Sequence, residues 1–204
     1  MPSGLRLLDI EGFTTELDKR LWNHCFDKLG VFTVMNSKNI EKIRKEIEQK
    51  PPLLTQEIVE STINRLYEDR KKYFVEGIID TFQRLSSDHK TNTNEKFKIP
   101  DKCVIKYMLE PSWSQSNHLR INYSNENRLE DIQRTFCVLD KKEFQQRQTV
   151  CEINAKLKEG NVYENEYFHL QGYKNGNIHI AFKRIDLLDA ANQLIADYYG
   201  NVLK

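Results

Sequence analysis

The sequence YENEYFHLQGYKNGNIHIAFK, from Tyr163 to Lys183, decides the fold because it has the pattern of a β-hairpin. Two alternating segments flank a turn that contains Asn175 and Gly176, residue types that tolerate the positive φ of a tight hairpin. A two-residue loop of Asn175 and Gly176 would mix apolar and polar side chains on each face. A three-residue loop that includes Lys174, with Gly176 left-handed, separates them. We therefore predict the three-residue loop.

This register gives the hairpin two unlike faces. One face is apolar, with Phe168 opposite Phe182 and Leu170 opposite Ile180. Glu166 is expected at the rim of that face, or paired with Arg184 on the opposite strand. The other face carries imidazoles, amides, phenols and an ammonium, and we predict a functional site there: Tyr167, His169, Gln171, Tyr173, Asn177, His179 and Lys183.

Composition limits the classes of partner. The chain has 204 residues, with 31 Lys and Arg against 30 Asp and Glu, and a formal net charge of +1. No global field therefore draws it to nucleic acid or to a membrane surface, so a nucleic-acid contact would have to be a local patch. The chain opens without a charged and then apolar leader, and no apolar run approaches the roughly 18 residues of a membrane span. We expect a cytoplasmic protein with no membrane partner.

The cysteines do not indicate a metal site or a disulfide framework. They lie far apart and form no CxxC motif: Cys25, Cys103, Cys137 and Cys151. The sequence also has no carboxylate cluster suited to a catalytic metal and no glycine-rich cofactor loop. We expect no cofactor and no obligatory metal.

Apolar periodicity predicts a mainly helical chain. Helices are expected over about residues 15–29, 37–50, 55–85, 128–139, 143–157 and 187–199, with a bend or break near the charged run 68–72. Residues 103–109 have the pattern of a strand, and 111–127 that of a long loop. The fold class is therefore α+β, mainly helical, with a small antiparallel sheet that contains the 163–183 hairpin. Pro51 and Pro52 suggest an N-terminal helical segment (1–50) and a main α+β domain (51–204).

Several short motifs resemble those of a known family. They are HKTN at 89–92, ENEY at 164–167 and KNGN at 174–177, followed by His179, Phe182, Lys183, Arg184, Asp186 and Leu187. Together they resemble the domain of unknown function 4942 family, over roughly residues 54–203. The resemblance implies a protein of prophages, plasmids and genomic islands, found near toxin genes or joined to adenine-methyltransferase-like modules. It implies a setting rather than a reaction.

The polar face of the hairpin suggests acid–base chemistry. His179 and His169 form a pair that suits proton transfer near neutral pH, from a ribose 2′-hydroxyl and to a leaving 5′-oxygen. Lys183 or Lys174 would steady the phosphate charge. The first hypothesis is therefore a metal-independent endoribonuclease. The alternative for His179 and Asn177 is structural, because either side chain could hold the turn or pack under the last helix.

Other residues suggest contacts to nucleic acid. Tyr167 and Tyr173, with Trp113 and Tyr123, could stack bases of a single strand, or they could serve ordinary packing. Asn177 and Lys174 would add polar contacts at the turn. His89, Lys90 and Asn92 could contact a phosphate or a base, or they could cap the preceding helix.

Two other functions stay open at this point. Near-zero net charge with 30% charged residues also fits a non-catalytic protein that inhibits a host defence system, of the anti-restriction or anti-CRISPR type. A weaker possibility is a domain that places DNA for a methyltransferase. The expected partner is thus RNA or DNA, or a host defence protein.

Overall fold

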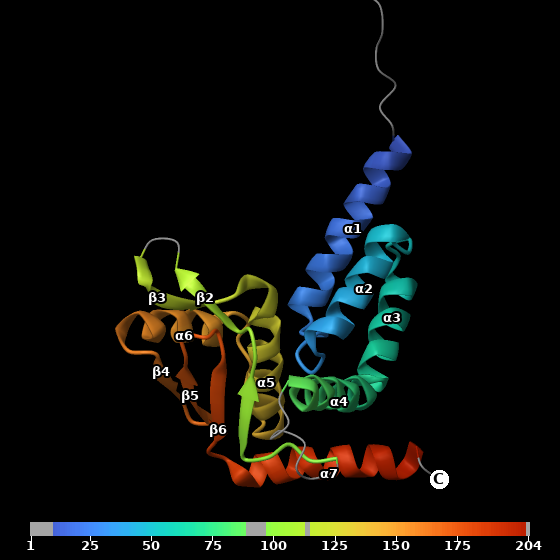
Figure 1. Ribbon diagram of the computed structural model, residues 1–204. Coiled ribbons are helices and arrows are strands. Elements are labelled where there is room, and N and C mark those ends of the chain that lie inside the picture. Colours follow the sequence, from blue (N-terminus) through green and yellow to red (C-terminus); the bar gives the residue numbers. More distant parts are fainter. Residues whose placement is uncertain (1–9, 89–96, 113–114, 203–204) are drawn as a thin grey trace, which may run out of the picture. The chain divides into compact units, whose positions relative to one another are not determined.

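The computed structural model describes residues 10–88, 97–112 and 115–202. The chain forms two compact units, residues 1–70 and 71–204. Helices predominate and the sheets are antiparallel, which confirms the α+β prediction (Figure 1). Within the described residues, no helix combines the length and the apolar character that crossing a membrane requires.

The first unit is helical. It contains α1 (Ile10–Lys28), α2 (Ser37–Gln49) and α3 (Gln56–Glu68). Asn36 caps α2, because its side-chain oxygen accepts the backbone N–H of Asn39 at 3.0 Å. Trp22 is fully buried and donates from its indole to the carbonyl of Pro52 at 2.8 Å. The domain boundary expected at residue 50 stays a prediction.

The second unit begins at Lys71, one residue into helix α4 (Arg70–Asp88). As expected, α4 is separated from α3 within the charged run, at Asp69. In the part of this unit that the structure describes, α5 (Glu126–Leu139), α6 (Gln148–Glu159) and α7 (Ile185–Val202) follow, with the short 3₁₀ helix η2 (Tyr123–Asn125) before α5.

A four-stranded antiparallel sheet is the centre of this unit. Its strand order is β1 (Lys102–Ile105), β6 (Ile178–Phe182), β5 (Phe168–Gly172) and β4 (Val162–Glu164). A separate two-stranded sheet joins β2 (Leu109–Ser112) and β3 (Gln115–Ile121). The predicted hairpin therefore forms the middle of the larger sheet.

The register of the hairpin is the predicted one. Phe168 lies opposite Phe182, and Leu170 lies opposite Ile180. The loop has three residues, because Tyr173 N–H donates to the Asn177 carbonyl at 3.0 Å. Gly176 is left-handed with φ 86°, as the loop requires.

The apolar face of the hairpin packs against helices. Phe182 stacks on Phe136 of α5, with ring centroids 5.1 Å apart and planes 9° apart. One buried cluster joins this face to residues of α5, α6 and α7, which Figure 1 shows gathered around the sheet: Leu129, Ile132, Val150, Ile153, Leu157, Leu187, Leu188 and Ala191. On the opposite face of the sheet, the side chains of β5 and β6 are half-buried or exposed: His169, Gln171, His179 and Ala181.

Three predicted boundaries are wrong. The segment 111–127 is not one long loop, because residues 115–121 form β3, and the segment 103–109 is divided by a turn at Tyr107. Helix α6 begins at Gln148, five residues later than predicted, because Arg147 takes a left-handed φ of 65°. Leu119 and Ile121 of β3 are buried and follow the polar residues 115–118, so the sequence does not show the alternation of a strand.

Candidate functional site

The face of the four-stranded sheet opposite the core, here called the outer face, carries both hairpin histidines. His169 lies opposite Ala181, and His179 lies opposite Gln171. Since side chains alternate along a strand and Leu170 and Ile180 are buried, His169 and His179 both point to the outer face. They are diagonal neighbours across β5 and β6, a relation with about 7–8 Å between backbones.

A hollow of about 350 Å³ lies on the outer face. It is lined from β1, β5, β6 and the segment before β1: Pro100, Asp101, Lys102, Cys103, Val104, His169, Gln171, His179, Ile180 and Ala181. Lys102 lies opposite Ala181 and Val104 lies opposite His179, so both side chains of β1 share the face of the imidazoles. The hollow thus brings two imidazoles, an amide and an ammonium together.

The carboxylate of Glu164 contacts His169 and is itself paired with the ammonium of Lys183. Nδ1 of His169 is 3.5 Å from Oε2 of Glu164, which lies directly opposite on β4. Nζ of Lys183 is 2.6 Å from Oε1 of Glu164 and 2.8 Å from the Asn165 carbonyl oxygen. The hydrogen bond from Lys183 and then that from His169 lower the pKa of Glu164 below its usual value of 4.5. Glu164 is therefore a charged acceptor that can keep a proton on Nδ1 of His169.

His179 is exposed to solvent and its imidazole contacts the ring of Tyr173. Its side chain is exposed, and its ring centroid is 4.3 Å from that of Tyr173. Gln171, opposite His179, donates from Nε2 to the carbonyl oxygens of Asn161 (3.2 Å) and Gly172 (3.1 Å). The amide of Gln171 is thereby fixed beside the imidazole.

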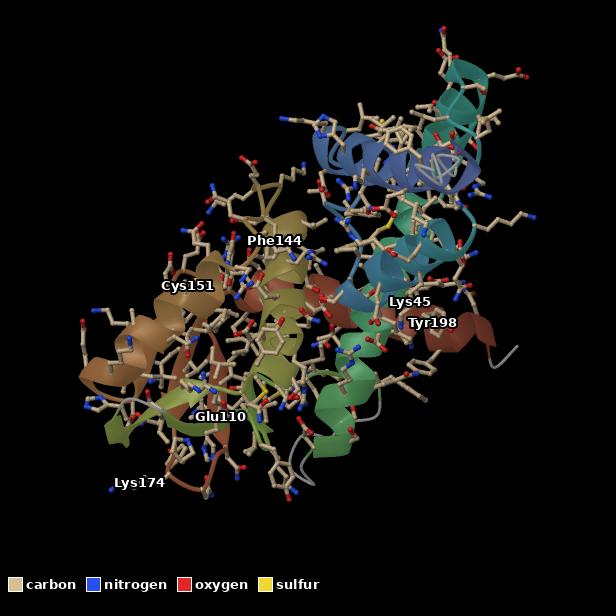
Figure 2. All side chains as sticks on the ribbon, turned by 90° about the horizontal axis from the view of Figure 1, so that it is seen from above. Lys45, Glu110, Phe144, Cys151, Lys174 and Tyr198 are labelled. Carbon is tan, nitrogen blue, oxygen red and sulfur yellow. The ribbon has the colours of Figure 1, made fainter. Side chains whose placement is uncertain are left out.

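The turn residues lie at one end of the outer face. Tyr173 is 40% exposed, and Asn177 is half-buried opposite it. Lys174 projects outward at the tip of the turn (Figure 2). Lys90 and Asn92, like His89, lie outside the described residues.

The prediction that Tyr167 stacks bases is wrong. Its side chain is completely buried, with its ring centroid 5.7 Å from that of Phe136 and its hydroxyl 3.2 Å from Oδ2 of Asp140. The cause is a turn before the strand, because Oδ1 of Asn165 accepts the backbone N–H groups of Tyr167 and Phe168 at 2.9 Å each. Strand alternation starts only at Phe168 and does not reach Tyr167. Burial raises the pKa of the Tyr167 phenol.

Lys183 is placed differently from the role predicted for it. Its ammonium is engaged by Glu164, so its contact with a substrate phosphate stays a prediction. Sequence reasoning missed Lys102 and Glu164 as members of the site. Lys102 had no local signal, because β1 joins the hairpin from a distant part of the chain. Glu164 was also hidden, because counting back by alternation from Leu170 puts it on the apolar face, whereas the turn at Asn165 and the pairing of β4 with β5 bring it opposite His169.

A second hollow of about 350 Å³ is lined by residues of α5 and α6 and by Phe144, which Figure 2 labels. In it Tyr163 donates its hydroxyl to Oε2 of Glu152 at 2.7 Å. Glu166 sits at its rim, exposed as expected, and pairs with Lys142. The predicted pair of Glu166 with Arg184 is wrong, because the guanidinium of Arg184 binds Asp140 at 3.1 Å and Asp186 at 2.7 Å.

Among the described residues, no group of three or more His, Cys, Asp or Glu side chains is arranged to hold a metal ion.

A family model described as Domain of unknown function (DUF4942) matches residues 14–201, which spans parts of both units. No curated protein and no solved structure matches the chain.

Proposed function

The chain belongs to the DUF4942 family, and within it we propose a mobile-element protein that acts on nucleic acid as a metal-independent endoribonuclease. The observation that carries the proposal is the pair of imidazoles, His169 and His179, on one open face of a rigid sheet. Diagonal neighbours about 7–8 Å apart at the backbone can reach opposite sides of one phosphodiester group. Two imidazoles so placed can share a proton abstraction and a proton donation.

The reaction is an internal transfer within RNA. A neutral imidazole accepts the proton of a ribose 2′-hydroxyl, and the 2′-oxygen attacks the adjacent phosphorus. The bond from phosphorus to the 5′-oxygen of the next nucleotide breaks, and that oxygen takes a proton from an imidazolium. The products are a 2′,3′-cyclic phosphate and a free 5′-hydroxyl, so one proton is taken and one is returned.

The contacts of the two histidines assign the role of base to one and the role of acid to the other. Glu164 holds a proton on Nδ1 of His169, which leaves Nε2 as the acceptor of the 2′-hydroxyl proton. His179 then acts as the acid, with its ring kept in place by Tyr173. Lys102, exposed in the same hollow, supplies positive charge for the phosphate. Lys183 acts through Glu164 as a positioning residue.

Cleavage of labelled RNA in the presence of EDTA tests the proposal. We expect wild-type protein to release a 2′,3′-cyclic phosphate end. His179→Ala and His169→Ala should each slow the reaction at least about 100-fold, the low end of what a positioned acid or base contributes. His118→Ala is the matched control, because His118 lies on β3 in the other sheet and should leave the rate unchanged. Cleavage by His179→Ala at the wild-type rate, or no cleavage of varied RNAs by wild-type protein, would contradict the proposal.

A second candidate is a non-catalytic protein that inhibits a host defence system. The observation in its favour is that several cations near the hairpin are already paired with carboxylates, which leaves less charge for a nucleic-acid backbone: Lys183 with Glu164, Lys142 with Asp140, and Arg184 with Asp140 and Asp186. Copurification from host lysate separates the two. A stoichiometric protein partner, without any nucleotide product, selects this candidate over the nuclease.

A further inference from the structure

Two exposed tyrosines are carried by adjacent backbone segments of the second unit. Tyr107, in the turn between β1 and β2, and Tyr123, in η2, are each 75% exposed. The backbone N–H of Asn122 donates to the Met108 carbonyl at 2.8 Å, and Nδ2 of Asn125 donates to the Tyr107 carbonyl at 2.9 Å. These two bonds join the turn to η2 on both sides of Tyr123.

The conformation of Tyr107 is costly for the fold. Its φ is 57°, in the left-handed region where a bulky side chain is an outlier and where glycine or asparagine fits better. Backbone outliers of this kind are concentrated at functional sites. Most of the large ring is nevertheless left in water. Burial of the Tyr107 ring therefore does not offset the cost of its backbone conformation.

Both rings are available for stacking. The aromatic pairs among the described residues involve other rings, and neither Tyr107 nor Tyr123 belongs to one of them. Lys106 precedes Tyr107 directly in the chain, and an exposed ammonium, that of Lys174, stands at the neighbouring hairpin tip. Aromatic faces next to cations are what unpaired bases and their phosphates require.

The turn that carries Tyr107 lies beside the hairpin turn, at one end of the sheet. The backbone N–H of Leu109 donates to the Gly176 carbonyl at 2.9 Å, which fixes the β1–β2 turn against the hairpin turn. Tyr173 lies at the same end of the sheet, and its ring reaches His179. A single-stranded RNA that reaches the imidazole pair from this end of the sheet would therefore pass exposed aromatic rings.

We propose that Tyr107 and Tyr123 form a base-stacking subsite for the single-stranded RNA that the outer face cleaves. The inference rests on the proposed function and adds the form of the substrate, because only unpaired bases have free faces to stack. The subsite binds nucleotides next to the scissile one, so it sets affinity for longer strands. Very short substrates, which end before the turn, do not use it.

Fluorescence anisotropy with a labelled, single-stranded 2′-O-methyl RNA tests the subsite, since this oligonucleotide lacks the attacking hydroxyl and is not cleaved. Tyr107→Asn removes one ring in a residue type that accepts the left-handed backbone, and Tyr123→Ala removes the other. Each should raise Kd roughly tenfold, within the range of stacking contributions. Tyr107→Phe and Tyr123→Phe keep the rings and should bind as wild type. Tyr198→Ala, on α7, is the matched control and should bind as wild type.

Unchanged Kd for both Tyr107→Asn and Tyr123→Ala would overturn the subsite, and so would failure of wild-type protein to bind the oligonucleotide. The results that contradict the proposed nuclease differ from those that contradict the subsite. If the two variants bind weakly but wild-type protein cleaves no RNA, the subsite stands and the nuclease falls. If His179→Ala abolishes cleavage while both tyrosine variants bind normally, the nuclease stands and the subsite falls.

Discussion

Gly176 shows how much of the outer face depends on one backbone angle. Its φ of 86° closes the three-residue loop, and a Cβ at this position would lie 3.0 Å from the Leu109 carbonyl oxygen. Any other loop length would move the imidazoles, because a one-residue shift turns every side chain of a strand to the other face. The glycine thus maintains the register that brings His169 and His179 to one side.

Gly176→Ala is expected to lower the free energy of unfolding by about 1–2 kcal/mol, the cost of a left-handed residue with a Cβ. Chemical denaturation measures the loss. Gly160→Ala is the control, because a Cβ there has no neighbour within 4 Å and φ is extended, so we expect no loss of stability. Equal stability of the two variants would show that the loop does not need its glycine.

At the scale of elements, a buried carboxylate joins two helices. Glu130 of α5 is 4% exposed and accepts the backbone N–H groups of Arg147 (2.9 Å) and Val150 (3.4 Å) at the start of α6. Burial raises the pKa of Glu130 above its usual 4.5, although the two backbone hydrogen bonds oppose the shift. Folding therefore favours the protonated form of this carboxyl group.

The raised pKa of Glu130 makes the free energy of unfolding depend on pH. The stabilisation linked to Glu130 is complete below pH 4.5 and is lost as the pH rises through the raised pKa of the folded state. Glu130→Gln does not titrate, so the stability of wild-type protein relative to this variant should fall as the pH is raised from 4.5 toward neutral. Urea unfolding of both proteins across this range provides the measurement. A relative stability that rises with pH would contradict the shift.

The elements differ in how well the sequence predicts them. The hairpin was predictable because alternation and a turn signal lie within one short segment. β3 was missed because its buried residues, Leu119 and Ile121, follow a polar half, and Tyr167 was misplaced because the Asn165 turn is a side-chain effect. The pairing of β1 with β6, which brings Lys102 to the site, is set by tertiary packing that local patterns do not carry.

At the scale of the whole molecule, the second unit carries all of the proposed chemistry. Its buried cluster runs from Ile78 to Ile195, and the outer face lies between Lys102 and Lys183. The family match nevertheless begins at residue 14, inside the first unit. The two units therefore belong to one family module, although the described site needs side chains from the second only.

A fragment of residues 71–204 should consequently fold and cleave RNA like the full chain. Circular dichroism, cooperative unfolding and the cleavage assay in EDTA check this expectation, and a fragment of residues 51–204 compares the boundary predicted from the two prolines. A fragment 71–204 that is unfolded while 51–204 is folded would place residues before Lys71 in the structural core of the domain.

The central claim is that His169 and His179 act together on one phosphodiester group. Single-turnover cleavage of RNA by His169→Ala, His179→Ala and the double variant tests it most directly. Groups that act as a unit lose their effect together, so the double variant should be no slower than the slower single variant. Wild-type rates in all three variants, with intact folding, would contradict the account.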